Sequence, residues 1–246
     1  MRLIFPESRD PVDAAEVYAD IPRADRRPSV RLNMIVSVDG GTSWGGVSGG
    51  LGGPADKALF GVLRSLTDMV LVASGTMRAE HYGPAVLPEE VRTARRARGQ
   101  TEVPPIAVVS ASCQFDFDTS FFTDAVERPV ILTVQSSAPE DRARATKFAD
   151  VLIVGDDLVD LTAALGELGK RGAHTVLAEG GPTLNGELAR AGLLDELCVT
   201  LAPLLASGDA KRIIAGSTLE KLEQLRIRSI CEQDGYLFLR YRPAPS

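Results

Sequence analysis

The segment TVLAEGGPTLNGELARAG, which runs from Thr175 to Gly192, contains a complete strand–turn–helix unit. The continuous apolar run Thr175–Ala178 predicts a short strand that is buried on both faces. Glu179-Gly180-Gly181 supplies the turn, and Pro182 stands at the first helical position, where its missing N–H is not needed. The helix then places Leu184, Leu188 and Ala191 on one side and is expected to end at Gly192. The segment predicts an α/β fold.

The rest of the chain repeats this pattern. Further short apolar runs are MIVSV, DMVLVAS, PIAVVS, PVILTV, DVLIVG and ELCVTLAP. Helical patterns lie between several of them, such as LTAALGEL at 161–168, so a largely parallel sheet covered on both sides is expected. Near the end, LRIRSI and YLFLRY flank Asp234–Gly235, which is a hairpin turn signal. The predicted sheet is therefore mixed, mostly parallel, with an antiparallel C-terminal hairpin.

Composition restricts the classes of function. The 246-residue chain has a net charge of −6 and a pI near 5.1, which argues against nucleic-acid or anionic-membrane partners. Three widely spaced cysteines without C-x-x-C predict reduced thiols and a cytoplasmic protein. Neither a signal peptide nor an apolar run of membrane-spanning length is present in the sequence. We expect a loosely attached lead-in at 1–28 and one domain at 29–246.

Two glycine-bearing strand ends predict a ligand site. Glycines before a helix N-terminus let backbone N–H groups approach an anion, so Gly180 and Gly181 predict a phosphate site or form an ordinary tight turn. Ser74-Gly75-Thr76 follows another apolar run in the same way. Ligands gather where the carboxyl ends of adjacent strands meet. Glu179 ends an apolar strand and needs a partner, which we expect an amino-substituted ring to supply.

Two matches to the G-x-S-x-G elbow, around Ser43 and Ser48, keep a serine hydrolase open as an alternative. In each match more glycine follows the serine, instead of the helix that the elbow requires. The chain offers His81 and His174 as candidate bases. No dinucleotide-binding G-x-G-x-x-G follows a strand, and no P-loop occurs.

Several motifs together resemble one known family. They are Ser37-x-Asp39-Gly40, Leu63-Arg64, Gly75-Thr76, EGGPTLNGEL and LLDELCVTLAPLL. They are similar to the reductase domain of riboflavin biosynthesis, whose fold resembles dihydrofolate reductase, a three-layer α/β/α sandwich. The resemblance runs from Val30 to Tyr241. It implies an NADPH-dependent homodimer that reduces the ribosyl group of 5-amino-6-(5-phosphoribosylamino)uracil, or a related pyrimidine, to ribityl. The zinc deaminase motifs of that family, H-x-E and P-C-x-x-C, are absent from the sequence, and no metal site is expected.

The resemblance and the glycine turns together give the expected site. The expected cofactor contacts are Val36, Gly50, Ser74, Gly75, Thr76, Glu80, Gly180 and the turn Gly181–Glu187, which includes Pro182, Thr183 and Leu184, with Ser110 near the 2′-phosphate. The expected substrate contacts are Asn33, Ser48, Asp56, Arg64 and Glu179, of which Asp56 and Glu179 are the expected catalytic residues.

The sequence also departs from the family pattern. Asn33 stands where the family often has lysine, and Glu80-His81-Tyr82 stands where it often has D-D-P. Asp56, in the first turn of a helix after Pro54, either complements that helix N-terminus or hydrogen-bonds a pterin-like or aminopyrimidine ring. A dihydrofolate or pterin reductase and a non-catalytic NADPH-binding protein therefore stay open. The glycine-rich stretch at 40–53 is expected to be a flexible lid.

Overall fold

The computed structural model describes residues 1–245. The strands are β1 (Arg2–Phe5), β2 (Ser29–Ser37), β3 (Met69–Ala73), β4 (Ile106–Val109), β5 (Val130–Thr133), β6 (Asp150–Ile153), β7 (Thr175–Ala178), β8 (Glu196–Ala202), β9 (Leu225–Gln233) and β10 (Tyr236–Pro243). The helices are α1 (Ala14–Tyr18), α2 (Pro54–Leu66), α3 (Ser74–Ala79), α4 (Glu89–Ala97), α5 (Ser120–Thr123), α6 (Pro139–Ala145), α7 (Leu161–Lys170) and α8 (Pro182–Arg190). Across residues 1–245, no helix combines the length and apolar character needed to cross a bilayer.

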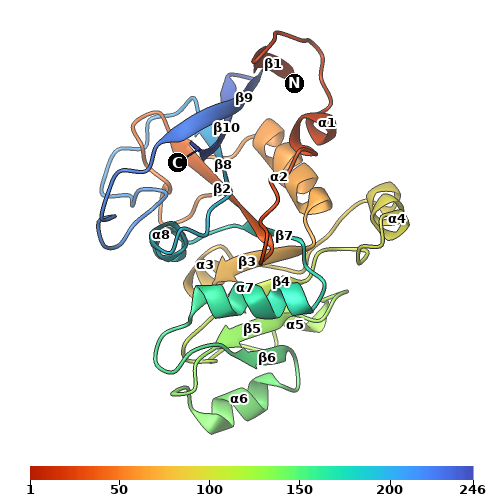
Figure 1. Ribbon diagram of the computed structural model, residues 1–246, viewed down its shortest axis with the longest axis vertical. Coiled ribbons are helices and arrows are strands. Elements are labelled where there is room, and N and C mark those ends of the chain that lie inside the picture. The colour runs from red at the N-terminus through yellow and green to blue at the C-terminus, as the bar shows by residue number, and fades with distance from the viewer. Residues whose placement is uncertain (246) are drawn as a thin grey trace.

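All the strands join one sheet in the order β1-β9-β10-β8-β2-β7-β3-β4-β5-β6 (Figure 1). From β8 through β2, β7, β3, β4 and β5 to β6 every pair is parallel, whereas β1, β9 and β10 are antiparallel to their neighbours. The turn between β9 and β10 has positive φ at Asp234 (54°) and Gly235 (81°), as the Asp-Gly signal requires. The predicted mixed, mostly parallel sheet with an antiparallel C-terminal hairpin is confirmed.

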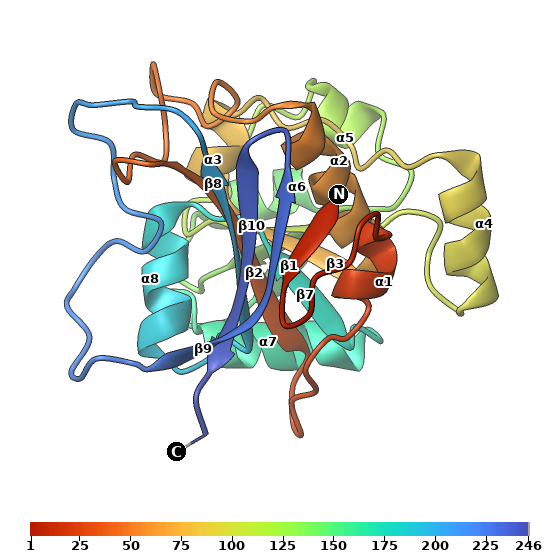
Figure 2. The same cartoon turned by 90° about the horizontal axis from the view of Figure 1, so that it is seen from above.

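Helices cover both faces of the sheet, so the three-layer sandwich is also confirmed. Side chains alternate between the faces of a strand, and in β3 Met69 and Leu71 join a core with α7 and α8, whereas Val70 and Val72 join a core with α3 and α5. A third apolar cluster lies between α1, α2 and the C-terminal strands. Figure 2 shows α7 and α8 on one side of the sheet and α2 and α3 on the other.

The unit from Thr175 to Gly192 folds as predicted. β7 is buried, α8 begins at Pro182, and Gly192 follows the helix with φ at 64°. Leu184 and Leu188 pack in the core beneath α7. Because β7 lies between β2 and β3, its glycine turn lies at the centre of the sheet's carboxyl edge.

Residues 1–28 are firmly attached, which corrects the expected loose lead-in; the domain division at residue 28 itself stays a prediction. β1 pairs with β9, so that Leu3 lies opposite Cys231, and α1 packs against α2. Tyr18 is fully buried, and its ring lies 4.8 Å from the Arg240 guanidinium carbon. The segment is held by α2 and by strands β9 and β10, which lie more than 200 positions away in sequence.

A buried ionic cluster lies under this segment. The carboxylate of Glu196, which has no exposed surface, binds Arg31 at 2.5 Å, Arg240 at 2.7 Å and Arg242 at 3.0 Å. Main-chain carbonyls of residues 17, 18 and 20 accept further hydrogen bonds from the same guanidinium groups. A buried carboxylate is tolerated only when it is fully paired, so Glu196 joins the N-terminal segment to β2 and β10.

Candidate active site

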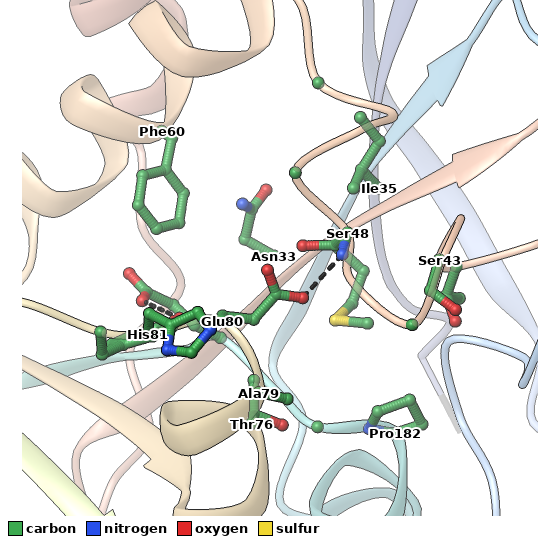
Figure 3. Close-up of a pocket in the computed structure, with 18 of the residues that line it drawn as sticks. Asn33, Ile35, Ser43, Ser48, Phe60, Thr76, Ala79, Glu80, His81 and Pro182 are labelled. Atoms are coloured by element: carbon green, nitrogen blue, oxygen red, sulfur yellow. Dashed lines mark hydrogen bonds between the residues drawn. The ribbon is translucent and has the colours of Figure 1, made fainter.

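A cavity of about 700 Å³ lies at the carboxyl edge of the sheet. Its walls come from β2, α2, the turn before α8, the segment 75–84, the glycine-rich stretch and residues 209–211. Figure 3 shows Asn33, Phe60, Thr76 and Glu80 around it. The cavity thus occupies the position that the two glycine-bearing strand ends predict.

Arg64, Glu179 and Tyr82 form a buried hydrogen-bonded group in the cavity wall. Arg64 donates to both carboxylate oxygens of Glu179, at 2.8 and 2.7 Å, and the Tyr82 hydroxyl donates to the same carboxylate at 2.8 Å. The guanidinium carbon of Arg64 lies 4.4 Å from the centre of the Phe60 ring. Glu179 therefore has its partners within the chain, which corrects our expectation that a bound ring supplies them.

The net pKa shifts of Arg64 and Tyr82 favour the ion pair. Burial alone would lower the pKa of the Arg64 guanidinium, but the neighbouring carboxylate of Glu179 raises it above its ordinary value. Burial, followed by the charge of Glu179, raises the pKa of Tyr82 well above its usual range. Arg64 therefore stays charged and Tyr82 stays a neutral donor.

Asp56 and Asn33 contribute polar groups on another side of the cavity. Asp56, in the first turn of α2, is half-buried, and burial raises its pKa although a hydrogen bond with Thr200 partly opposes the shift. Asn33, on β2, has a buried Oδ1 without a hydrogen-bond partner among residues 1–245. Asp56 thus both complements the α2 N-terminus and faces the cavity.

The glycine-rich stretch is fixed at its base and latched at its tip. Asp39 accepts hydrogen bonds from the backbone of Ala206 and Ser207, and Thr42 donates to the carbonyl of Lys211. Farther along, the backbone N–H of Ser48 donates to Glu80 at 2.7 Å across the cavity (Figure 3). That the glycine-rich stretch acts as a flexible lid over the cavity stays a prediction.

Glu80→Ala is expected to release the tip of this loop. The lost hydrogen bond to a charged group stabilises the closed loop by about 1.5 kcal/mol. Trp44, the one tryptophan of the chain, lies on the tip and is 66% exposed, so it reports the change directly. We expect lower fluorescence anisotropy and faster acrylamide quenching of Trp44. Glu90→Ala, on exposed α4, is the matched control. Equal anisotropy in the two variants would contradict the latch.

The N-terminus of α8 closes another side of the cavity. A Cβ built on Gly181 would lie 2.4 Å from the Thr76 hydroxyl oxygen, so only glycine lets the two strand ends approach so closely. Gly181 is also the N-cap and brings no side chain to the first-turn N–H groups, which include those of Thr183 and Leu184. These N–H groups are therefore free to donate hydrogen bonds to an anionic ligand.

The loop between β8 and β9 is docked on α8. Asn185 donates to the carbonyl of Ile213 at 2.7 Å, and Ala215 donates to the carbonyl of Pro182 at 3.0 Å. A Cβ on Gly186 would lie 1.9 Å from the Ala215 carbonyl oxygen. The helix and the loop thus meet backbone to backbone.

Gly186→Ala is expected to lower the free energy of unfolding by about 1–3 kcal/mol, because the added methyl group displaces this loop. The matched control is Gly166→Ala in α7, where an added Cβ meets no atom within 4 Å. That control should be neutral or more stable by up to about 1 kcal/mol, since alanine favours helix. Urea denaturation measures both variants. A Gly186→Ala protein as stable as the control would show that the loop is not seated there.

The structure brings together only part of the expected site. Residues that line the cavity are Asn33, Ser48, Asp56, Arg64, Gly75, Thr76, Glu80, Glu179, Gly181 and Pro182. Residues that do not line it are Val36, Gly50, Ser74, Ser110, Gly180, Thr183 and Leu184. Leu184 packs in the core, so only its backbone is available to a ligand. The assignment of all these residues to a ligand stays a prediction.

Sequence reasoning missed Lys57, Phe60, Tyr82 and Lys211, which also line the cavity. Phe60 lies four residues before Arg64 on α2, a spacing that puts both on one helix face and could have identified it. Lys211 lies in a loop without any pattern. Within residues 1–245, no hydrogen bond joins Ser43 or Ser48 to a histidine, so the arrangement that a serine hydrolase needs is not formed.

The fold is an α/β sandwich with a single mixed sheet, and the cavity lies at the carboxyl edge of that sheet. Residues 28–234 match the family model described as RibD C-terminal domain. The chain therefore belongs to the pyrimidine reductase family of riboflavin biosynthesis, and the resemblance inferred from the sequence is confirmed.

Individual relatives agree with this assignment. The chain is 30% identical over 214 residues to the 2,5-diamino-6-ribosylamino-4(3H)-pyrimidinone 5′-phosphate reductase of Aquifex aeolicus, covering 82% of this chain and 91% of that protein. The Archaeoglobus fulgidus protein of the same name is 27% identical over 208 residues, covering 81% of this chain and 94% of that protein. The crystal structure of a pyrimidine reductase-like protein from Corynebacterium diphtheriae superposes with a TM-score of 0.83 at 25% identity, covering 96% of this chain and all of that one.

Proposed function

We propose that the protein is an NADPH-dependent reductase that converts the ribosyl group of 5-amino-6-(5-phosphoribosylamino)uracil, or a related pyrimidine, into ribityl. One observation carries the proposal: a single cavity joins Gly75, in the first turn of α3, and the glycine turn before α8 to a polar wall beside an aromatic ring. The glycine side suits a dinucleotide phosphate, and Asn33, Asp56 and Phe60 suit a flat, polar heterocycle. Family membership supports the same reaction class.

The residues on the glycine side fit a dinucleotide. Gly181 leaves the N-terminus of α8 uncapped, and a Cβ on Gly75 would meet no atom within 4 Å, so a cofactor can approach both turns. The backbone of Gly180 to Leu184 would hold the pyrophosphate, with Thr76 beside it. Ser110, after β4, keeps its expected place near the 2′-phosphate by its position at a neighbouring strand end, and its buried hydroxyl oxygen lies outside the cavity wall.

The chemistry requires a hydride at C1′ of the sugar and a proton on the ring oxygen as the C1′–O4′ bond breaks. NADPH, when bound, supplies the hydride. Asp56 is the carboxyl group that this chain places in the cavity with a raised pKa, so it holds and delivers the proton at its carboxyl oxygen. Arg64, oriented by Glu179 and Tyr82, and Ser48 bind the phosphoribosyl group.

Asp56→Asn is expected to lower kcat by about 100-fold or more, because a general acid contributes about 10²–10⁴. In the wild type, kcat should fall as pH rises through the raised pKa of Asp56.

The effect of Asp56→Asn on the free energy of unfolding also has a defined sign. Because burial raises the folded-state pKa, the charged carboxylate destabilises the fold above that pKa but not below the unfolded-state pKa. Asp56→Asn should therefore be more stable than wild type at pH 7, with no difference at pH 3. Exposed Asp157→Asn is the control, and equal kcat in both variants would refute the role.

Oxidation of NADPH tests the proposal, with the phosphoribosylamino-pyrimidine and dihydrofolate offered separately and NADH as the cofactor control. Turnover of the pyrimidine alone supports the riboflavin reaction. Turnover of dihydrofolate alone supports the second candidate, a pterin reductase, which the position of Asp56 in the cavity favours. Binding of NADPH without oxidation by either substrate would indicate a non-catalytic binding protein.

The homodimer implied by the resemblance is part of the proposal, and sedimentation velocity tests it. The exposed Leu205 and Leu222 are candidates for covered residues, since they are 81% and 96% exposed in the single chain. All three cysteines are free and buried, as expected of reduced thiols, and we propose the cytoplasm as the location.

A further inference from the structure

Arg95 is a fully buried arginine on a helix that otherwise faces solvent. Its helix, α4, lies at the outer side of the molecule beside α2, as Figures 1 and 2 show. Two neighbours on α4, Arg92 and Arg96, pair with Glu102 near the surface. The side chain of Arg95 has no exposed surface. Because a buried charge is tolerated only with strong partners, the partners of Arg95 show what it does.

Those partners are main-chain carbonyls at the end of α2. Nη1 of Arg95 donates to the carbonyls of Arg64 at 3.2 Å, Ser65 at 3.0 Å and Thr67 at 2.6 Å. Nε donates to the carbonyl of Thr101 at 2.9 Å. The last carbonyl groups of a helix lack partners within the helix and form the negative end of its dipole. Arg95 therefore closes the C-terminus of α2 with a positive charge from another helix.

The charge of Arg95 persists at neutral pH. Burial lowers its pKa to about 10, although the nearby charge of Asp68 partly opposes the shift. Within residues 1–245, the hydrogen bonds of Arg95 all go to main-chain carbonyls, and its Nη2 is buried without a partner. The favourable interaction of this guanidinium is thus with a helix end and not with a carboxylate.

The turn that Arg95 holds carries Arg64. The main-chain carbonyl of Arg64 accepts a hydrogen bond from Arg95, while its guanidinium binds both carboxylate oxygens of Glu179 at 2.8 and 2.7 Å. Such a two-pronged pair has a narrow geometry, so the position of the Arg64 backbone decides whether the pair forms. A displacement of about 1 Å, even from a site far from the chemistry, can cost about 10²-fold in rate.

We propose that Arg95 is a positioning residue for Arg64. By fixing the last turn of α2, it keeps the guanidinium of Arg64 aligned with Glu179 at the cavity wall. This inference rests on the proposed function, in which Arg64 binds the phosphoribosyl group. It goes further by adding a residue that lies outside the cavity wall.

Steady-state kinetics provide the first test. Arg95→Met keeps the length of the side chain but removes the charge, and we expect KM for the phosphoribosylamino-pyrimidine to rise about tenfold or more with kcat changed less than about threefold. Arg95→Lys should stay within about threefold of the wild-type KM, because one ammonium has three donors for the three carbonyls that meet at Nη1. Arg98→Met is the matched control, since Arg98 donates to the Ser65 carbonyl at 3.0 Å from an exposed position.

The second test needs no substrate. In ¹⁵N NMR of the ligand-free protein, the Nε–H of Arg64 should exchange slowly with water, because it donates to Glu179. Its absence from the spectrum of Arg64→Lys assigns the signal. We expect exchange to be about tenfold faster or more in Arg95→Met, and close to wild type in Arg95→Lys and Arg98→Met. A purely structural role would lower the melting temperature and leave KM and this exchange rate unchanged.

Wild-type KM and exchange in Arg95→Met overturn the proposal, as does an equal rise of KM in Arg98→Met. A rise of KM in Arg95→Lys as large as that in Arg95→Met also overturns it, because charge at the helix end would then not be the property that matters. If the pyrimidine is not reduced, the proposed function fails, and the exchange rate of the Arg64 Nε–H still decides the role of Arg95. Where Arg95→Met does not fold, Arg95→Gln takes its place with the same expectations.

Discussion

Glu196→Ala is expected to lower the free energy of unfolding by about 3–5 kcal/mol, the cost of removing one partner from a buried ion pair. The carboxylate has no exposed surface and binds three guanidinium groups, two of them almost fully buried. Without it, Arg31 and Arg240 lie in the core with backbone carbonyls as their hydrogen-bond partners. The N-terminal segment should then detach from the sheet before the rest of the protein unfolds.

Urea denaturation measures the loss, and limited proteolysis reports release of the N-terminal segment. Glu196→Gln separates the contribution of charge from that of shape, because the amide fills the same space. The matched control is Glu223→Ala, an exposed residue for which no loss is expected. A loss below about 1 kcal/mol in Glu196→Ala would mean that the arginines are satisfied without the carboxylate.

Arg64→Met is the second variant for which we expect a large effect. It leaves the carboxylate of Glu179, whose side chain is 2% exposed, with the Tyr82 hydroxyl as its hydrogen-bond donor. The expected loss of stability is again about 3–5 kcal/mol. We also expect kcat/KM to fall by about 100-fold or more, since the cavity loses the cation assigned to the substrate.

The double variant Arg64→Met/Glu179→Leu separates the two effects. Replacing a buried ion pair by apolar residues of similar volume is often neutral in stability. The double variant should therefore regain most of the stability that Arg64→Met loses, while turnover stays low. Normal turnover in the double variant would refute any role of the pair in binding substrate.

The sequence predicted the elements that depend on neighbouring residues, but not those that depend on long-range pairing. The β7–α8 unit and the Asp234–Gly235 hairpin were predicted because each needs only neighbouring residues: an apolar run, a turn and a cap. The pairing of β1 with β9 was not, because its partners lie more than 200 residues apart and β1 itself is four residues long. An edge strand this short has no distinctive pattern.

The same limit applies to the site. Glu179 was identified from its place at a strand end, but its partner Arg64 lies 115 positions away, and no local pattern links the two. Arg95 shows that a local pattern can also mislead, because a run of arginines on a helix is typical of a solvated face. It is buried and donates to the carbonyls of Ser65 and Thr67. The sequence thus indicated which charged residues to consider, whereas long-range contacts determine which of them are paired.

The anchoring of the glycine-rich stretch has a consequence for the rate at which the cavity can be entered. Thr42 is fixed to the loop after β8, and the carbonyl of Leu51 accepts a hydrogen bond from Tyr236. Between these points, the bond from Ser48 to Glu80 is the contact that crosses the cavity. Opening at this place therefore breaks one hydrogen bond and leaves the sheet and its helices intact. Lid opening spans the microsecond-to-second range, and a loop held across the cavity by one hydrogen bond should open at the fast end of that range, ahead of typical turnover.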